Sequence, residues 1–495
     1  MTEHLISLLN NNNYLEAINY FLSLEEDESD EISEILAEEI VKDNSLIDKM
    51  IKLAVIDTDN NKVFDYIINN VSDALYDLYD EDEDENNIKD LIIILFRKLE
   101  KELAVFINAD NSLYYNNMND WFLKYGLIRY YFDDYKESIK IFESGIKFVK
   151  IKYNSYPFNS DDYAMIMLFL LHYYLGLVYS NDDNKIKSLE HYSIYLLMCQ
   201  TSNDIDIEKL ADIYLKISDV CSEDNREQYL LKSIHYYSEA IQRELENSGP
   251  EDLLDAYEKI IEYYDEKDNY SEKYFYLQKH CELSEKYFKE NDSDIDAIEK
   301  YMDSINAIIF FIVFDLDNAK EMLVEDKMLS SKEITIQNIV DEVLLKEMQT
   351  KAKNVFDEYE EEEVNSAYAY SNYLIGTYYK YEEDRKNTEK FLGISEDLYK
   401  KLIDDTEDQD YYDNLYDVYE NYRDFYQNID QEKHALKYLD KMIQLRLDLY
   451  DENPDDEDAK DNLANAYYDA SEFCDLIGKD KLGQKYMIEF ENYSE

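Results

Sequence analysis

Small residues recur along this sequence at a spacing of twelve positions. Gly126 is followed by Ser138, with Phe142 four positions later, and Gly176 is followed by Ser188 in the same way. A residue with little or no side chain lets two chain segments approach closely, so a constant interval places close contacts at equivalent points of successive units. The spacing therefore predicts a chain built from a repeated structural unit.

The composition favours helices for this unit. The 495 residues include only 8 Gly and 3 Pro, whereas strand-rich folds use these residues in their many turns. The abundant leucine, glutamate, lysine and alanine suit helices joined by short polar turns. Between Gly176 and Ser188, the acidic and amide residues 181–184 separate two amphipathic segments. We therefore expect an all-α protein whose unit is helix, turn, helix.

Further copies of the unit follow with variations. The same or nearly the same interval separates Ser218 from Ser233 (three positions more), Ala307 from Ala319, Val340 from Ala352, and Gly376 from Thr388. Residues 413–438 align with residues 461–486 at an offset of 48 without a gap. Two copies are irregular. Lys273 stands where a small residue is expected, and no turn residue follows Val340, so that copy is either a hairpin or one long helix.

These units resemble tetratricopeptide (TPR) repeats, whose pattern is W-x2-L-G-x2-Y, then A-x3-F, then P. In this resemblance Gly126 and Ser138 are the small residues at positions eight and twenty, and Phe142 is at position twenty-four. Pro454 matches the proline that ends the preceding helix. The resemblance implies an α-solenoid of helix-turn-helix repeats forming a right-handed superhelix. Arg129 replaces the usual tyrosine and the copies are about 33 to 50 residues apart, so irregular repeat lengths are expected.

The resemblance also divides the chain into two regions. Residues 112–495 are expected to form an array of about eight TPR-like repeats. Residues 1–111 are expected to form an N-terminal helical region with an acidic loop near residues 80–85, where the sequence reads DEDEDE. Within this region, Ala17 and Phe21 are spaced as in the second helix of a repeat.

The charge balance limits the possible partners. Lysine and arginine number 50 against 114 acidic residues, which gives a formal net charge of −64. A field of this sign repels nucleic-acid phosphates and anionic lipid headgroups and attracts basic proteins and peptides. We therefore expect a protein or peptide partner of basic character, no nucleic acid and no membrane.

One uncharged run, residues 163–181, approaches the length of a membrane-spanning helix. It contains His172 and four tyrosines and has no basic flank, which favours a buried helix over a membrane span. The four cysteines lie far apart and form no CxxC pair, so they fit a reducing, cytoplasmic environment.

The sequence contains no recognisable catalytic or cofactor motif. GxGxxG, GxxxxGK[ST], HExxH and GxSxG are all absent, and the six histidines have no ligand spacing. We expect no enzymatic activity, no cofactor, no catalytic residue and no metal site. His172 and His191 could face each other across one helix pair, which leaves a minor metal-binding alternative.

Residues 292–303 place Asp292, Asp294, Asp296 and Asp303 in the register of a calcium-binding EF-hand loop. Ala297 replaces the required glycine and the final glutamate is missing. We therefore favour the start of a helix with acidic residues in its first turn.

By the same resemblance, positions two, five, nine, twelve and thirteen of each first helix line the concave face of the solenoid. In early copies these positions are apolar or aromatic, at Leu123, Leu127, Tyr130, Tyr131 and Tyr173. In later copies they are acidic, at Glu258, Glu262, Asp265, Asp413 and Asp417. These residues are the candidate partner-binding residues. The acidic set is alternatively a solvated face of a very acidic protein.

The expected function is a non-enzymatic protein–protein interaction scaffold that binds a basic partner segment in its concave face. The alternative is a regulatory TPR module that senses a short peptide, and an enzyme or metal-binding protein is less favoured. TPR domains that bind acidic C-terminal tails carry Lys at position five and Asn at position nine. Here those positions hold leucine or aspartate, so recognition of acidic tails is disfavoured.

Overall fold

The computed structural model describes residues 2–21, 23, 26–57, 61–81, 85–109, 114–152, 163–201, 206–243, 249–316, 318, 320, 341–359, 361–406, 408–452, 454 and 456–494. In these residues every regular element is a helix and no β-strand occurs. The prediction of an all-α fold is therefore confirmed.

The chain forms two compact units, Met1–Asn247 and Ser248–Glu495. The boundary expected near residue 111 lies inside the first unit, where the helices on either side of it pack together. Each unit has its own hydrophobic core and is described by itself below.

The first half of the N-terminal unit is a cluster of helices around one core, which contains Phe64, Phe96 and Trp121. Its elements are α1 (Thr2–Asn10), α2 (Tyr14–Phe21), α3 (Glu26–Lys42), α4 (Ser45–Ile56), α5 (Lys62–Tyr66), the π-helix η1 (Ile67–Val71), α6 (Ser72–Glu81) and α7 (Glu85–Asn108). Helices α6 and α7 occupy both ends of the acidic stretch at 80–85, and residues 82–84 lie outside the described residues.

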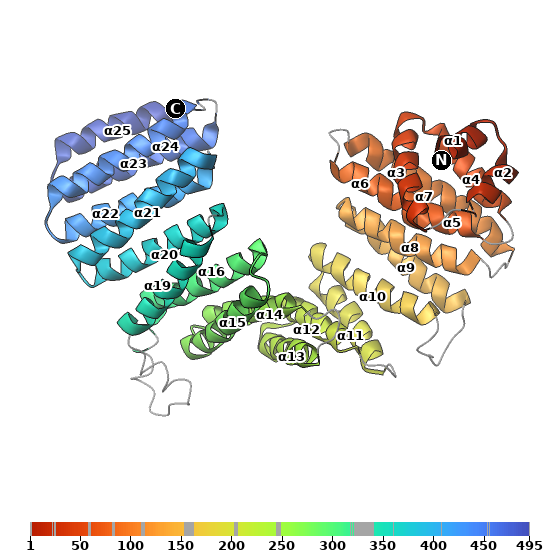
Figure 1. The fold of residues 1–495 in the computed structure, drawn as a ribbon, viewed down its shortest axis with the longest axis horizontal. Coiled ribbons are helices and arrows are strands. Elements are labelled where there is room, and N and C mark those ends of the chain that lie inside the picture. Colours follow the sequence, from red (N-terminus) through yellow and green to blue (C-terminus); the bar gives the residue numbers. More distant parts are fainter. Residues whose placement is uncertain are drawn as a thin grey trace. The chain divides into compact units, whose positions relative to one another are not determined.

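The rest of this unit consists of helix pairs (Figure 1). The pairs are α8 (Tyr115–Tyr131) with α9 (Tyr135–Lys152), α10 (Tyr163–Asn181) with α11 (Lys185–Thr201), and α12 (Ile207–Val220) with α13 (Glu223–Gln242). Each pair also packs against the next, since α9 contacts α10 and α11 contacts α12.

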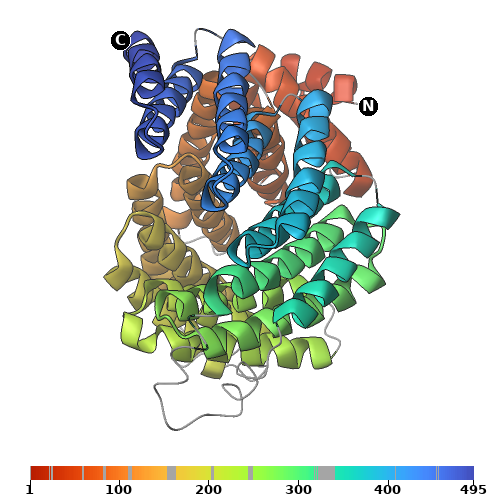
Figure 2. The same ribbon diagram turned by 90° about the vertical axis from the view of Figure 1, so that its left-hand side faces the viewer.

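The C-terminal unit continues the same arrangement of paired helices. Its elements are α14 (Pro250–Glu266), α15 (Tyr270–Glu290), α16 (Ile295–Phe310), the π-helix η3 (Phe311–Asp315), α19 (Asp341–Glu358), α20 (Glu362–Tyr381), α21 (Arg385–Thr406), α22 (Gln409–Asn428), α23 (Glu432–Glu452), α24 (Glu457–Leu476) and α25 (Asp480–Ser494). In Figure 2 the cyan and blue helices of the last pairs lie next to one another as adjacent rods. The predicted packing of helices as consecutive antiparallel pairs is confirmed.

One type of turn closes most of the pairs. Among the described residues, eight have a φ in the left-handed region. One of them, Asn61, precedes α5, and the other seven lie in turns between paired helices, at Asn12, Asp133, Asp183, Asp268, Glu383, Asp430 and Gly478. The N–H of the following residue donates to the carbonyl five positions earlier; for example, Asp134 donates to Arg129 at 2.9 Å and Asn184 to Tyr179 at 2.8 Å. This is the hydrogen bond of a Schellman motif, which ends a helix at a fixed point. A shared turn of fixed length explains why the small residues keep a spacing of twelve.

The small residues lie where the paired helices cross. A Cβ on Gly126 would be 2.3 Å from Phe142 Cε1, and one on Gly176 would be 2.3 Å from Tyr192 Cδ1. Ser138 Oγ donates to the carbonyl of Gly126 at 2.7 Å. The same bond, from serine to glycine twelve positions away, joins Ser188 to Gly176 and Ser471 to Gly483. The repeated pairs of small residues are therefore contact points between helices, as the sequence predicted.

Two copies differ from the predicted spacing for a visible reason. Only Cys221 and Ser222 separate α12 from α13, and both are extended rather than left-handed. The wider interval from Ser218 to Ser233 therefore does not come from the longer turn that the sequence suggested; it arises because α13 starts at Glu223, well before Ser233. Lys273 takes the place of a small residue because its ammonium group is held by the carboxylates of Asp265 and Asp315.

The predicted hairpin after Ala307 is wrong. Helix α16 continues without a turn into η3, because the apolar side chains of Ile308, Ile309 and Phe311 remain buried along this stretch. Ala319 and Val340 lie outside the described residues. Ala352 belongs to α19, a single helix, so the alternative of one long helix is correct for that segment.

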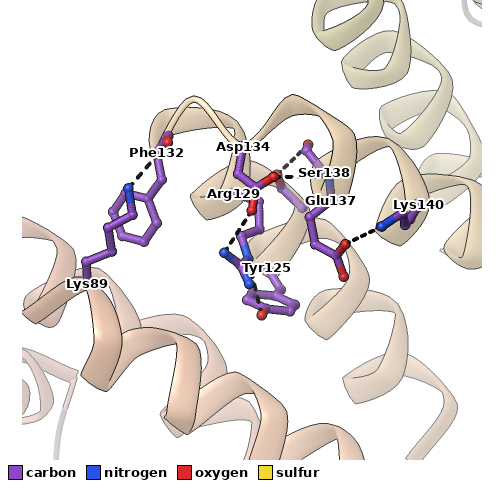
Figure 3. Close-up of polar contacts among 9 residues, drawn as sticks. Lys89, Tyr125, Arg129, Phe132, Asp134, Glu137, Ser138 and Lys140 are labelled. Atoms are coloured by element: carbon purple, nitrogen blue, oxygen red, sulfur yellow. Dashed lines mark hydrogen bonds and ion pairs between the residues drawn. The ribbon is translucent and has the colours of Figure 1, made fainter. Parts of the chain in front are cut away.

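Arg129, the departure from the family tyrosine, is buried at the end of α8 (Figure 3). Its Nε donates to the Tyr125 hydroxyl at 3.2 Å, and its Nη1 donates to Asp134 Oδ2 at 3.0 Å in the turn before α9. The guanidinium thus ties the end of the first helix to the turn that leads into the second.

Two other expectations concern single helices. Asp294 caps α16 by accepting a hydrogen bond from the N–H of Asp296, so residues 292–303 are a helix start and not a calcium loop. In the described residues one helix, Ala164–Asn181, is long and apolar enough to cross a membrane, and 56% of it is buried. Leu168, Leu171 and Leu175 of this helix lie in the core between the pairs, which fits the buried-helix interpretation.

We predict opposite effects from adding the same methyl group at two helical glycines. Gly126→Ala should lower the thermal midpoint, because overpacking against Phe142 costs about 1–3 kcal/mol and outweighs a helix-propensity gain of up to about 1 kcal/mol. Gly393→Ala is the matched control, since its Cβ would meet only the Tyr422 hydroxyl at 3.4 Å. It should raise the midpoint or leave it unchanged. Equal shifts for both variants in a thermal melt would contradict the crossing at Gly126.

Candidate functional site

The apolar candidates on α8 largely contact their own neighbours. Leu123, Leu127 and Tyr130 are half-buried and pack against the core formed with α10. The Tyr130 hydroxyl also accepts a hydrogen bond from Asn181 Nδ2 at 2.8 Å. These three side chains therefore belong mainly to the packing between repeats.

The remaining aromatic candidates differ from each other in exposure. Tyr173 is half-buried, and burial, followed by the nearby carboxylate of Asp212, raises the pKa of its hydroxyl. Tyr131 is 52% exposed, and its ring lies 5.4 Å from that of Tyr76. Among the five aromatic and aliphatic candidates, Tyr131 offers the largest exposed apolar surface.

The acidic candidates on α14 are exposed, yet two of them already have partners. Asp265 is held by Lys273, as described above. Glu258 lies 3.3 Å from His280 Nε2, and this contact lowers the pKa of the Glu258 carboxyl. Glu262 is exposed on the same helix. The α14 face is therefore less negative than its sequence suggests.

The two candidates on α22, Asp413 and Asp417, differ in whether they form an ion pair. Asp413 forms an ion pair with Arg446, which reaches across from α23. Asp417 has no ion pair within the described part of the chain, and burial, together with Glu420 and Asp413, raises its pKa to about 6. The negative charge of Asp417 also raises the pKa values of Tyr370 and Tyr373 on α20, which places its carboxylate beside that helix.

A recess of about 410 Å³ lies beside these residues in the C-terminal unit. It is formed by the first helices α16, α20 and α22 together with one residue of α21. Its lining residues are Glu299, Asp303, Asn306, Glu363, Ser366, Ala367, Tyr370, Tyr399, Tyr411 and Asn414. The lining combines three carboxylates, three tyrosines and two amides and contains no lysine or arginine.

The carboxylates of the recess are not neutralised by ion pairs within the described residues. Burial, then Glu363 and Asp303, raises the pKa of Glu299, although Lys300 acts in the opposite direction. Burial, then Glu258, raises the pKa of Asp303. The raised pKa values mean that the ionised carboxylates of Glu299 and Asp303 are destabilised in the folded protein. A cation placed in the recess would relieve this repulsion.

The sequence pointed to only some of the residues that line this recess. Asp303 stands out only as part of the possible calcium loop at residues 292–303, which also contains Glu299, and Glu363 lies in a stretch rich in glutamate, residues 358–363. Tyr370 stands six positions before Gly376, so the repeat register carried onto α20 would have placed it on the binding face. Tyr399 lies on a second helix, for which the register of first helices gives no signal.

The structure brings His172 and His191 together, with 2.9 Å between their Nδ1 atoms. Burial lowers the pKa of both imidazoles, to about 3 for His172. No third acidic, cysteine or histidine side chain completes a metal-binding group there or elsewhere in the described residues. The pair is therefore a hydrogen-bonded contact between α10 and α11.

Comparisons with known proteins give likenesses of architecture only. No protein-family model and no curated protein matches the sequence. The apo form of the quorum sensor NprR from B. thuringiensis is similar, with 13% identity, a TM-score of 0.33, and 86% of this chain and 97% of that chain covered. A monomeric IFIT1 mutant with m7Gppp-AAAA is 12% identical with a TM-score of 0.26, covering 95% and 96% of the two chains.

The APC/C hetero-tetramer Cut9-Hcn1 is 11% identical with a TM-score of 0.22, covering 90% of this chain and 93% of that chain. All three TM-scores are low. The fold assignment therefore rests on the helix pairing described above, and these likenesses carry no argument about function.

The raised pKa of Asp417 predicts a pH-dependent effect of neutralising it. Because the folded pKa of about 6 lies above the ordinary value, the charged form destabilises the folded state at pH values above 6. Asp417→Asn should therefore raise the thermal midpoint at pH 8, and this gain should disappear as the pH falls from 7 to 4. Asp461→Asn, at the aligned position of Asp413 on α24, is exposed and serves as the control. A gain that is the same at both ends of the pH range would contradict the assignment.

Proposed function

We propose that this protein is a non-enzymatic TPR-like interaction scaffold whose C-terminal unit binds a basic polypeptide segment. The observation that carries this proposal is the recess of α16, α20 and α22, which gathers Glu299, Asp303 and Glu363 without a basic residue in its lining. First helices are the binding face that the TPR resemblance implies, and the recess lies on three of them.

Charge complementarity favours a basic partner over the alternatives. Carboxylates that repel one another gain when a cation approaches, whereas a phosphate group or an acidic tail would add to the repulsion. The net charge of −64 extends the same preference to longer range. The IFIT1 structure contains m7Gppp-AAAA, but the acidic recess makes RNA an unfavourable ligand for this chain.

The candidate residues contribute unequally to the proposed surface. Asp417 acts on Tyr370 and Tyr399 in the lining, so it adjoins the recess and extends its negative charge along α22. Glu262 is an exposed position on α14. Asp265 and Asp413 are already paired, so they contribute less. In the N-terminal unit, Tyr131 is the residue that we propose as a separate apolar contact.

A regulatory module that senses a short peptide would use the same recess and is the second candidate. The described cysteines are free thiols, which is compatible with the expected cytoplasmic location. That location remains a prediction.

The proposal predicts that a basic peptide binds and that the recess carboxylates account for its affinity. In fluorescence anisotropy, a labelled lysine- and arginine-rich peptide should bind, and raising salt from about 0.1 M to about 1 M should weaken the binding. The combined substitution Glu299→Gln, Asp303→Asn and Glu363→Gln should remove most of the binding and most of its salt dependence.

The control variant carries Glu457→Gln, Asp461→Asn and Glu491→Gln, which remove the same charge from exposed positions on α24 and α25. It should bind the peptide nearly as well as the unmodified protein. If both variants lose the same affinity, only net charge is acting and the recess is not the site. If a glutamate-rich peptide binds as well as the basic one, the choice of a basic partner is wrong.

A further inference from the structure

Tyr399 is a buried polar residue in the lining of the recess. It is 2% exposed and comes from α21, behind the first helices. Its hydroxyl has no hydrogen-bond partner among the described residues. Burial raises the pKa of this hydroxyl, and Tyr370, Tyr411 and Asp417 act on it in the same direction, so it remains neutral and lies among the polar groups of the recess. The hydroxyl oxygen is not among the fully buried polar atoms that lack a partner, and because Tyr399 lines the recess, a ligand placed there can donate a hydrogen bond to it.

The walls beside Tyr399 are aromatic. The Tyr411 ring lies 6.3 Å from the Tyr399 ring, and the Tyr370 ring stacks on that of Tyr373 at 5.9 Å. The Tyr411 hydroxyl donates to Glu362 Oε1 at 2.9 Å, which fixes the orientation of this side chain. The recess thus offers ring faces and edges that are held in place before any ligand arrives.

The acidic sides of the recess are held by a direct link between α16 and α20. Asn306 Nδ2 donates to the carbonyl of Ala367 at 3.1 Å, and Asn306 Oδ1 accepts from Ser371 Oγ at 2.5 Å. Asn306 is 5% exposed, so the link is shielded from water. It sets the separation between α16, which carries Asp303, and α20, which carries Glu363, and both residues line the recess.

We propose that this recess holds the guanidinium group of an arginine side chain of the partner. The inference rests on the function proposed above and specifies the residue that is recognised. A guanidinium presents several N–H donors in one plane, so it can serve the carboxylates on α16 and α20 and the Tyr399 hydroxyl together. Its flat faces also stack on tyrosine rings.

An ammonium group fits this recess less well. Lysine concentrates its charge on one strongly hydrated nitrogen, and it would have to lose this water to reach Tyr399 behind the first helices. Guanidinium is more weakly hydrated, so entering a partly buried space costs it less. The combination of aromatic walls, separated carboxylates and a buried hydroxyl acceptor therefore selects arginine over lysine.

The test compares two peptides of equal length and charge, a Gly-Arg repeat and a Gly-Lys repeat, by isothermal titration calorimetry with the full chain. The Gly-Arg peptide should bind about tenfold more tightly, which corresponds to one additional charge-assisted hydrogen bond and its stacking. Tyr399→Phe removes only the hydroxyl. It should reduce this preference to about threefold or less while the affinity for the Gly-Lys peptide stays nearly unchanged.

Tyr468→Phe, a tyrosine on α24 away from the recess, is the matched control and should leave the preference unchanged. Equal affinities for the two peptides in the unmodified protein would overturn the arginine inference and leave the proposed binding of basic segments intact. A preference that survives Tyr399→Phe would also overturn it, because the recognition would then occur elsewhere. If neither peptide binds, the proposed function fails as well.

Discussion

The left-handed turn residue between paired helices is the constraint on which the rest of the structure depends. Each turn of this type ends the first helix at a hydrogen bond from the next residue back to the carbonyl five positions earlier. The second helix must then start at a fixed point. Gly126 therefore always meets Ser138 and Phe142, and Gly176 meets Ser188 and Tyr192. The helices can approach this closely only because a side chain is missing at the crossing.

The candidate binding recess lies where this regularity is interrupted. Helix α16 has no such turn after it, because it continues into a π-helix over Phe311–Asp315. Instead of a standard hairpin contact, α16 is linked to α20 through the buried side chain of Asn306. This leaves the acidic side chains of α16 facing those of α20. A local departure from the repeat thus coincides with a recess whose lining contains three carboxylates and no lysine or arginine.

The helix pairs could be predicted from the sequence, whereas the residues available for binding could not. The pairs follow from local information, namely small residues at a fixed interval and polar turns. Whether a carboxylate is free depends on residues that are distant in the sequence: Asp413 is paired with Arg446 on the next helix, and Asp265 with Lys273. The same limit applies to Tyr399, which reaches the recess from a second helix. The hairpin expected after Ala307 failed because spacing alone does not distinguish a turn from a continuous apolar helix.

The shared turn also bears on how such a chain folds. Its closing hydrogen bond joins residues only five positions apart, and the serine-to-glycine bond at the crossing joins residues twelve positions apart. Contacts this local require little loop-closure entropy, so a single hairpin is a small and rapidly formed nucleus. Each hairpin then offers its apolar face to the one made after it, as in other repeat arrays. During synthesis, a pair such as α8 and α9 can therefore form as soon as it leaves the ribosome, before the later pairs exist.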